Sequence, residues 1–233
     1  QDPAEARTIL GDLKVSAQKI EEHGRRADGI IKNMLLHSHG GPGEYHKTDL
    51  NHLLDEYLNL AYHGIRAQLI DFNVDLVRDF DPAVGEVEVV PQQLGRVFIN
   101  LFNNAFYAMN EKAREEGASF HPELRVTTRA EGARIRIRVV DNGPGIPPEI
   151  QRKVFEPFFT TKPTGDGTGL GLSLSHEVIA VEHGGTLEVE SEEGTFTAFT
   201  ILLPRRRRAS SVHGDGSATA NVDAPSPPFD VEP

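Results

Sequence analysis

Cysteine is absent from the 233 residues of this chain, which excludes disulfides, thiol catalysis and thiolate metal sites. No apolar stretch reaches the roughly 18 residues that a membrane-spanning helix needs. The first residues lack the basic and apolar regions of a signal peptide. Positive charge is also scarce: the net charge is -11, which argues against a nucleic-acid-binding surface.

These absences fit a reducing compartment, and we expect a cytoplasmic location. The beginning at Gln1 resembles a cut from a longer protein, whose other parts could hold a membrane anchor. The length is sufficient for one substantial domain with appendages. We therefore divide the chain into a helix with its linker at 1–45, a domain at 46–204 and a tail at 205–233.

The first segment is predicted to be one long helix from residue 1 to about residue 37. Apolar and small residues recur there at alternating steps of three and four, the heptad pattern of a helix bundle or coiled coil. They are Leu10, Leu13, Ala17, Ile20, Gly24, Ala27, Ile31 and Met34. One such stripe cannot bury itself, so a partner helix is implied. The alternative is an amphipathic helix folded onto its own domain.

The second segment, 46–204, is predicted to be a single α+β domain. Helices are expected from Thr48 to about Ala67, from Pro91 to about Glu116, and from Leu170 to His183. Strands are expected at 72–80, 84–90, 124–128, 134–140, 186–190 and 195–203, several of them with clear alternation. Antiparallel strands with helices between them predict helices stacked on one sheet face.

The third segment, 205–233, begins with four arginines and continues through Ser, Gly, Ala, Asp and Pro. This composition is typical of a disordered tail, first basic and then acidic. An arginine cluster can bind an anionic surface or partner, but we interpret this one as a solvated end.

A glycine-rich run at 165–172, Gly-Asp-Gly-Thr-Gly-Leu-Gly-Leu, is the most informative motif. Such a run lets backbone N–H groups close around a phosphate, with the N-terminus of a helix aimed at its charge. It is neither the dinucleotide pattern G-x-G-x-x-G nor a P-loop. Two partners precede it, Asp141-Asn-Gly143-Pro-Gly145 and Asn100-x-x-x-Asn104.

These partners carry polar groups at defined places. Asp141 follows a predicted strand, where its carboxylate can accept a hydrogen bond from an exocyclic amine such as adenine N6, although the segment is also turn chemistry. Asn100 and Asn104 share one helix face. Amides on a partly apolar helix need a polar partner unless they are exposed. Asn103 is expected to face elsewhere.

In this order the three motifs resemble the ATP-binding domain of sensor histidine kinases. That family belongs to the GHKL superfamily, which includes Hsp90, type II topoisomerase ATPases and MutL. The resemblance runs from about residue 20 to Pro204. It implies a two-layer α/β sandwich of the Bergerat type, with a mixed, mostly antiparallel sheet and helices on one face.

The resemblance also implies ATP and Mg²⁺ as ligands. Asp141 would bind adenine, Asn104 would coordinate Mg²⁺, and Asn100 would lie in the same site. The segment 155–162, Phe-Glu-Pro-Phe-Phe-Thr-Thr-Lys, matches the family's F box, and its Lys162 would meet phosphate charge at the root of a mobile lid. Catalytic roles therefore go to Asn100, Asn104 and Lys162. Further cofactor contacts are expected from Gly143, Gly145, Phe159, Thr161, Thr168, Gly169, Leu170, Gly171 and Thr195.

Asn100 separates two reaction classes. The ATPases and serine kinases that share this fold usually have a glutamate there as general base. An amide cannot take a proton near neutral pH, whereas a neutral imidazole acceptor is already a nucleophile. The residue favours a kinase over a hydrolase of the Hsp90 or topoisomerase kind. A degenerate dimerising scaffold is the third alternative.

The chain departs from the family in two ways. It has no acceptor box of the form His-Glu-x-x-Asn/Thr-Pro, and its N-terminal helix resembles the second helix of the family's dimerisation hairpin. We therefore expect a truncated kinase whose partners are the missing helix with the acceptor histidine, a response regulator receiver domain and, in the full protein, a second copy. The other departure is Tyr107, where many members have a basic residue. Because Lys112 and Arg114 come later, the cation that meets the phosphates is left open.

Overall fold

The computed structural model describes residues 43–69, 72–163 and 167–205, with six helical, exposed residues nearer the N-terminus. These six are Leu13, Ser16, Ala17, Lys19, Ile20 and Gly24. The rest of the predicted heptad helix and the predicted tail beyond residue 205 lie outside the described residues. None of the described helices is long and apolar enough to cross a membrane.

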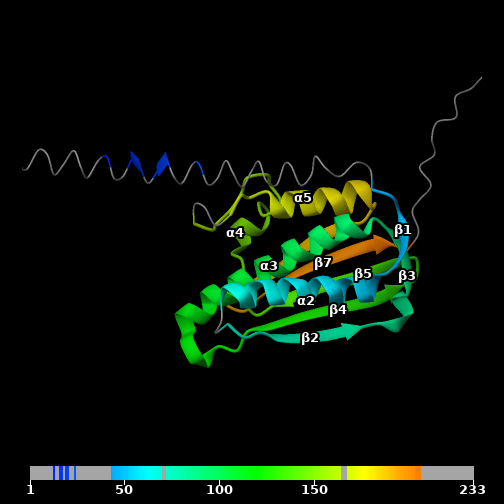
Figure 1. The fold of residues 1–233 in the computed structure, drawn as a ribbon, viewed down its shortest axis with the longest axis horizontal. Coiled ribbons are helices and arrows are strands. Elements are labelled where there is room, and N and C mark those ends of the chain that lie inside the picture. The colour runs from blue at the N-terminus through cyan, green and yellow to red at the C-terminus, as the bar shows by residue number, and fades with distance from the viewer. Residues whose placement is uncertain are drawn as a thin grey trace, which may run out of the picture.

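A five-stranded sheet forms one layer, with the strand order β2-β4-β5-β7-β6 (Figure 1). The strands are β2 Asp75–Phe80, β4 Glu123–Glu131, β5 Arg134–Asp141, β6 Thr186–Glu192 and β7 Phe196–Pro204. Neighbours run antiparallel except β2 and β4, which are parallel. The predicted mixed, mostly antiparallel sheet is confirmed. The predicted strand at 72–80 is shorter in the structure, because Phe72 and Val74 enter as buried coil.

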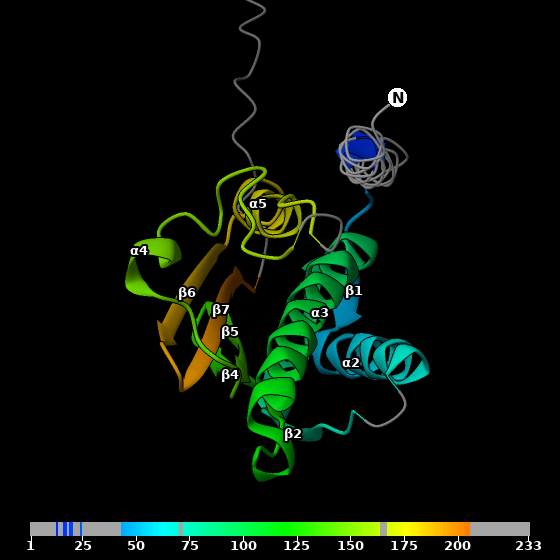
Figure 2. The ribbon, with the colours of Figure 1, turned by 90° about the vertical axis from the view of Figure 1, so that its left-hand side faces the viewer.

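Three helices cover one side of this sheet: α2 Leu50–Gln68, α3 Pro91–Glu116 and α5 Gly171–Glu177 (Figure 2). The apolar face of α3 repeats every four residues, so Phe98, Phe102 and Phe106 are fully buried between α2 and the sheet. On β5, Ile135 and Ile137 point into the same core. The predicted two-layer arrangement with helices on one face is confirmed.

A small second sheet departs from the prediction. β1, His46–Asp49, pairs antiparallel with β3, Glu86–Val89, where the sequence predicted a helix beginning at Thr48. Asp49 ends this strand and caps α2, since its carboxylate accepts from the N–H of His52 at 3.0 Å. The helix therefore begins at Leu50, two residues later than predicted. Short helical turns occur at Pro82–Val84, Gly117–Ser119 and α4, Pro148–Gln151.

The helix predicted from Leu170 to His183 has two parts. α5 ends at Glu177, and a π-helical turn continues it over Val178–Glu182. His183 then closes the segment: its Nδ1 donates to the carbonyl of Val178 at 2.9 Å, and its Nε2 accepts from the N–H of Val90 at 3.1 Å. The hydroxyl of Tyr45 donates to the carbonyl of Glu182. The end of this helix is thereby attached to the edge of the small sheet.

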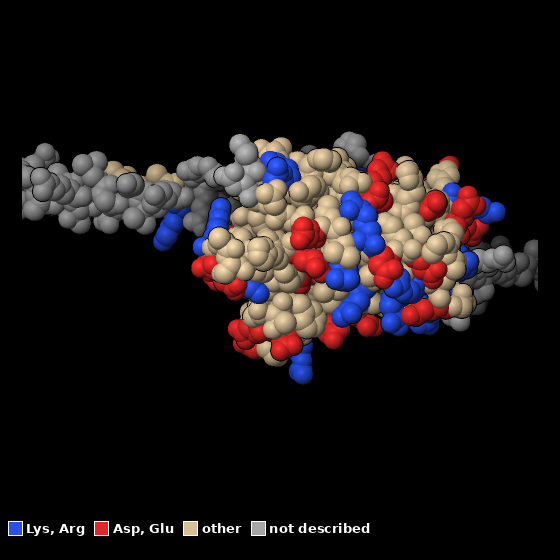
Figure 3. All heavy atoms as spheres, turned by 90° about the horizontal axis from the view of Figure 1, so that it is seen from below, with Lys and Arg blue, Asp and Glu red and all other residues tan. Residues whose placement is uncertain are grey.

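Charges of both signs are interleaved on the surface seen from below (Figure 3). On the main sheet, Arg138 pairs with Glu190 at 2.8 Å and Arg129 pairs with Asp79. Neighbouring opposite charges of this kind neutralise one another. The described part of this face therefore carries no broad field of a single sign.

Candidate functional site

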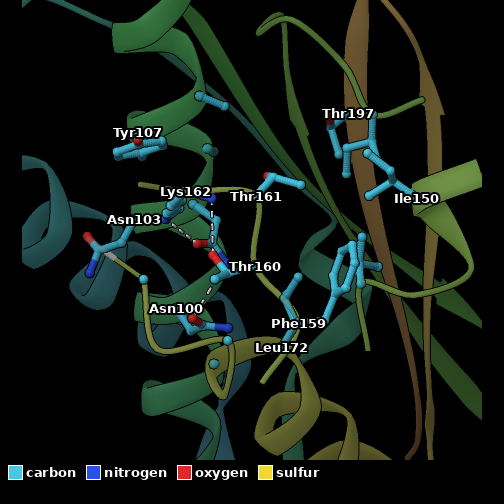
Figure 4. Close-up of a pocket in the computed structure, with 18 of the residues that line it drawn as sticks. Asn100, Asn103, Tyr107, Ile150, Phe159, Thr160, Thr161, Lys162, Leu172 and Thr197 are labelled. Atoms are coloured by element: carbon cyan, nitrogen blue, oxygen red, sulfur yellow. Dashed lines mark hydrogen bonds between the residues drawn. The ribbon is translucent and has the colours of Figure 1, made fainter. Parts of the chain in front are cut away.

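A cavity of about 470 Å³ lies between α3, the end of β5, β7 and the segments 144–162 and 167–172 (Figure 4). All three predicted motifs reach it. α3 contributes Asn100 and Asn104, the end of β5 contributes Asp141, and the glycine-rich run contributes Thr168 and Gly169. Residues more than 60 positions apart in the sequence are thus brought to one concave surface.

Asp141 is the buried carboxylate of this cavity, with 3% of its surface exposed. Burial raises its pKa to about 7, against the opposing effect of hydrogen bonds from backbone N–H groups and of the charge on Lys112. The N–H of Gly143 donates to its Oδ1 at 3.0 Å. Near neutral pH this group is therefore poised between an acceptor-only carboxylate and a neutral acid.

The loop after β5 is tightly fitted. A Cβ on Gly143 would lie 2.6 Å from Asp141 Oδ1, and Gly145 has φ +71 with the carbonyl oxygen of Glu192 at 2.2 Å from its would-be Cβ. Only glycine meets both the positive φ and the close approach at position 145. Gly145 lines the cavity, whereas Gly143 packs beneath Asp141 without lining it.

The two cations that the sequence left open are not among the residues that line the cavity. Lys112 Nζ donates to the carbonyls of Asn142, Gly143 and Gly194 at 3.1, 3.3 and 2.8 Å, and thereby fastens the loop after β5. Arg114 pairs with Glu111 at 3.0 Å on the helix surface. Neither lines the cavity, whereas Lys162 does.

A chain of hydrogen bonds connects α3 with Lys162 on one side and with α5 on the other (Figure 4). Lys162 Nζ donates to Asn104 Oδ1 at 2.9 Å, and Asn104 Nδ2 approaches Asn100 Oδ1 at 3.5 Å. Asn100 Nδ2 donates to the hydroxyl of Ser175 at 3.0 Å. Asn103 also lines the cavity, which corrects the expectation that it faces elsewhere. Positions 100, 103, 104 and 107 share one helix face, which is wide enough for all four.

The glycine-rich run approaches its neighbours as closely as the loop after β5 does. Gly169 has φ +70, and a Cβ there would lie 2.3 Å from the carbonyl carbon of Phe158. A Cβ on Gly171 would lie 2.1 Å from Asn100 Oδ1. The N–H of Phe158 donates to the carbonyl of Gly169 at 2.9 Å, so the F box and the glycine run are joined by their backbones.

Most predicted site residues line this one cavity: Asn100, Asn104, Asp141, Gly145, Phe159, Thr161, Lys162, Thr168, Gly169 and Gly171. Gly143, Leu170 and Thr195 do not. Thr195 lies in the turn before β7, and Thr197 lines the cavity instead. Sequence reasoning missed Thr197 and Phe199, although the period of two along β7 turns both toward the core side. It also missed the apolar wall of Ile146, Ile150 and Leu172.

Comparison with known proteins agrees with this geometry. The family described as histidine kinase-, DNA gyrase B-, and HSP90-like ATPase matches residues 89–207. The chain belongs to this family. The match spans α3, the loop after β5, the glycine-rich run and β7, which are the elements that surround the cavity.

Curated members of the family with similar sequences are sensor kinases. The chain is 29% identical to the sensor histidine kinase ZraS of Escherichia coli K12 over 201 residues, 86% of this chain and 40% of ZraS. It is 33% identical to the sensory histidine kinase/phosphatase NtrB of Salmonella typhimurium over 190 residues, 81% of this chain and 51% of NtrB. The chain therefore spans about half or less of the length of these relatives.

Solved structures give the same result. The nucleotide-free catalytic domain of the histidine kinase ThkA is 32% identical, with a TM-score of 0.58 over 70% of this chain and 97% of that domain. ThkA in complex with the response regulator TrrA is 26% identical, with a TM-score of 0.56 over 88% of this chain and 53% of that chain. The predicted kinase catalytic domain, with its ATP-binding fold, is thus confirmed.

Proposed function

We propose that this chain is the ATP-binding, phosphoryl-donating part of a two-component sensor histidine kinase. It holds Mg²⁺-ATP in the cavity beside α3 and presents the γ-phosphoryl group to a histidine on a dimerisation helix. The observation that carries the proposal is the polarity of the cavity. A buried carboxylate, Asp141, and a cluster of amides with one ammonium, Lys162, line the same 470 Å³.

The part of the cavity around Asp141 suits adenine. Asp141 accepts from the exocyclic amine, where guanine has a carbonyl that would leave the carboxylate unpaired. Apolar side chains of Ile146, Ile150 and Phe199 supply flat contact area around it. Thr197 is the hydroxyl on the β7 side of the same wall.

The part around Asn104 suits the phosphates. Lys162 places a positive charge there, and the backbone of the glycine-rich run around Gly169 supplies N–H donors. Asn104 Oδ1 is an oxygen ligand of the kind that Mg²⁺ takes, usually with phosphates and waters completing its shell. When bound, Mg²⁺ neutralises charge on the transferring phosphoryl group. Among the described residues, no group of three or more His, Cys, Asp or Glu could hold a metal ion.

Asn100 lacks the chemistry of a hydrolase. Its amide is engaged by Ser175 and cannot take a proton from water. Catalysis then rests on positioning and on charge stabilisation, as is usual in phosphoryl transfer. An incoming imidazole needs no base, so the acceptor is a histidine, and a receiver domain takes the phosphoryl group next. The complex of ThkA with its response regulator supports that second partner.

The test is to follow the label from γ-labelled ATP with Mg²⁺. We expect the label to stay on ATP with this chain alone, and to move to a histidine when a fragment that supplies the acceptor helix is added. Steady release of free phosphate would instead indicate an ATPase. An absence of ATP binding, equal in wild type and Asp141→Asn, would indicate a scaffold. Acid-labile label on this chain would mean that one of its own histidines is an acceptor.

A further inference from the structure

The cavity draws its positive charge from one side chain. Among the described residues that line it, Lys162 is the one Lys or Arg, and it comes from the segment after Phe159 rather than from α3. The polar side chains that α3 contributes to the lining are those of three asparagines, Tyr107 and Glu111. A lysine has four rotatable bonds in its stem, so its ammonium needs a partner to stay at one place.

Tyr107 and Asn104 supply that partner together. The ammonium of Lys162 lies 4.2 Å from the centroid of the Tyr107 ring and 2.9 Å from Asn104 Oδ1. The two residues are three apart on α3 and so face the same way. Figure 4 shows Tyr107 and Lys162 side by side against this helix. Before Mg²⁺ takes Asn104 Oδ1, the lysine is therefore held at a fixed point of α3, although it belongs to a loop.

We propose that Tyr107 is a positioning residue for Lys162. Its ring holds the ammonium where the phosphates of the nucleotide lie, so that the segment after Phe159 supplies the cation that α3 does not. The inference rests on the proposed function, since it assigns the phosphate part of the same cavity.

An aromatic ring is suited to this task. A carboxylate in its place would neutralise the ammonium and repel the phosphates. A ring face attracts the cation through its quadrupole and brings no negative charge of its own to the phosphate part of the cavity. Holding the stem before the ligand arrives also reduces the ordering cost of binding. Tyr107 thus adds affinity for phosphate without contact between its ring and the phosphates.

The experiment compares Tyr107→Leu with Tyr107→Phe, which keeps the ring. The dissociation constants of Mg²⁺-ATP and of adenosine are measured by calorimetry for each. We expect Tyr107→Leu to weaken Mg²⁺-ATP about 3- to 30-fold and adenosine less than about twofold, with Tyr107→Phe near wild type in both. Equal losses for ATP and adenosine would overturn the proposal, because the ring would then serve the base or the fold. Equal losses in the Phe and Leu variants would overturn it too, because the hydroxyl would carry the effect.

A double-variant cycle tests the route through Lys162. In a Lys162→Met background, Tyr107→Leu should cost nothing further, since the cation that the ring holds is gone. Tyr107→Lys in that background should restore Mg²⁺-ATP binding by placing the cation on α3. Additive losses, or no rescue by the new lysine, would contradict the proposal.

A readout without nucleotide separates this inference from the proposed function. In ligand-free protein, the Cε protons of Lys162 should show an upfield ring-current shift in the NMR spectrum. The shift should persist in Tyr107→Phe and vanish in Tyr107→Leu. Its absence from the wild type would overturn the positioning role even if ATP binds. If the shift is present but wild type binds adenosine and not Mg²⁺-ATP, the phosphate part of both proposals fails.

Discussion

The side-chain amide of Asn100 donates to the hydroxyl of Ser175 at 3.0 Å, and this bond joins α3 to α5 beneath the cavity. Ser175 is 4% exposed, so the bond is shielded from water. Asn100 Oδ1 in turn leaves no space for a side chain at position 171. Asn100 therefore forms a hydrogen-bonded contact between two helices.

Removal of the Asn100–Ser175 hydrogen bond should lower the free energy of unfolding. Ser175→Ala leaves the Asn100 amide without its partner, and we expect a loss of about 1–3 kcal/mol in the free energy of unfolding. Urea denaturation measures it. Ser173→Ala is the matched control, because that hydroxyl donates to the carbonyl of Leu170, the residue that caps the same helix. A loss in the control equal to that in Ser175→Ala would contradict the role of the contact between helices.

Gly169 provides a second prediction, with Gly132 as its control. Both have positive φ, +70 and +61, but a Cβ meets the backbone of Phe158 at 2.3 Å in the first and open space in the second. Gly132→Ala should cost about 1–2 kcal/mol of backbone strain. Gly169→Ala should also displace the F box, and so weaken Mg²⁺-ATP binding by more than about tenfold. Titration calorimetry measures the dissociation constant of Mg²⁺-ATP for both variants, and equal values would refute the prediction.

The sequence predicted α3 to the residue and the main strands closely, because their periodicity coincides with what the core requires. Phe98, Phe102 and Phe106 repeat at four residues and pack on a sheet that alternates at two. The polar motifs predicted the cavity for a similar reason. A carboxylate such as Asp141 is unfavourable in an apolar core, and the glycines near it add no apolar surface, so these residues indicate a ligand site or a turn.

What the sequence missed was decided by tertiary contacts. β1 is four residues long and exists because β3 is beside it, so local pattern could not reveal it. The π-helical turn after α5 is fixed by His183, whose bonds reach Val90, 93 residues earlier. The prediction for Asn103 was wrong because the sequence alone does not show which segments of the fold surround this face of α3.

His183 yields a third prediction. Its ring is 7% exposed and bonded at both nitrogens, and burial lowers its pKa. The unfolded state therefore binds a proton more readily than the folded state. The free energy of unfolding should be unaffected by this group above about pH 6.5 and should fall as the pH drops below that value.

The measurement is the free energy of unfolding at about pH 7.5 and pH 5.5 for wild type and His183→Leu. The variant leaves the N–H of Val90 buried without a partner, and we expect it to lose about 1–3 kcal/mol at the higher pH. The difference in free energy of unfolding between variant and wild type should be smaller at the lower pH, because protonation of His183 then destabilises the folded wild type. His52→Gln, at an exposed position on α2, is the control and should show neither effect. A loss in His183→Leu that grows as the pH falls would refute the sign of this argument.

Asp141 supports the last prediction, on adenosine binding. Burial raises its pKa to about 7 in the ligand-free protein. An exocyclic amine that donates to the carboxylate favours the ionised form, so binding lowers this pKa and releases a proton. Affinity for adenosine, which has no phosphate to titrate, should therefore rise from about pH 6 to pH 8, by less than tenfold per pH unit.

Asp141→Asn keeps the shape of the side chain and removes its titration. We expect adenosine to bind about 10- to 100-fold more weakly, with an affinity that does not change over this pH range. Calorimetry in two buffers of different protonation enthalpy would count the protons released by the wild type and find none for the variant. Proton uptake by the wild type, or a pH dependence that survives in Asp141→Asn, would show that another group controls the binding of the base.

The free energy of unfolding supplies an independent check, with the opposite trend in pH. Because the folded pKa is raised, the ligand-free wild type should lose stability relative to Asp141→Asn as the pH rises from about 4 through 7.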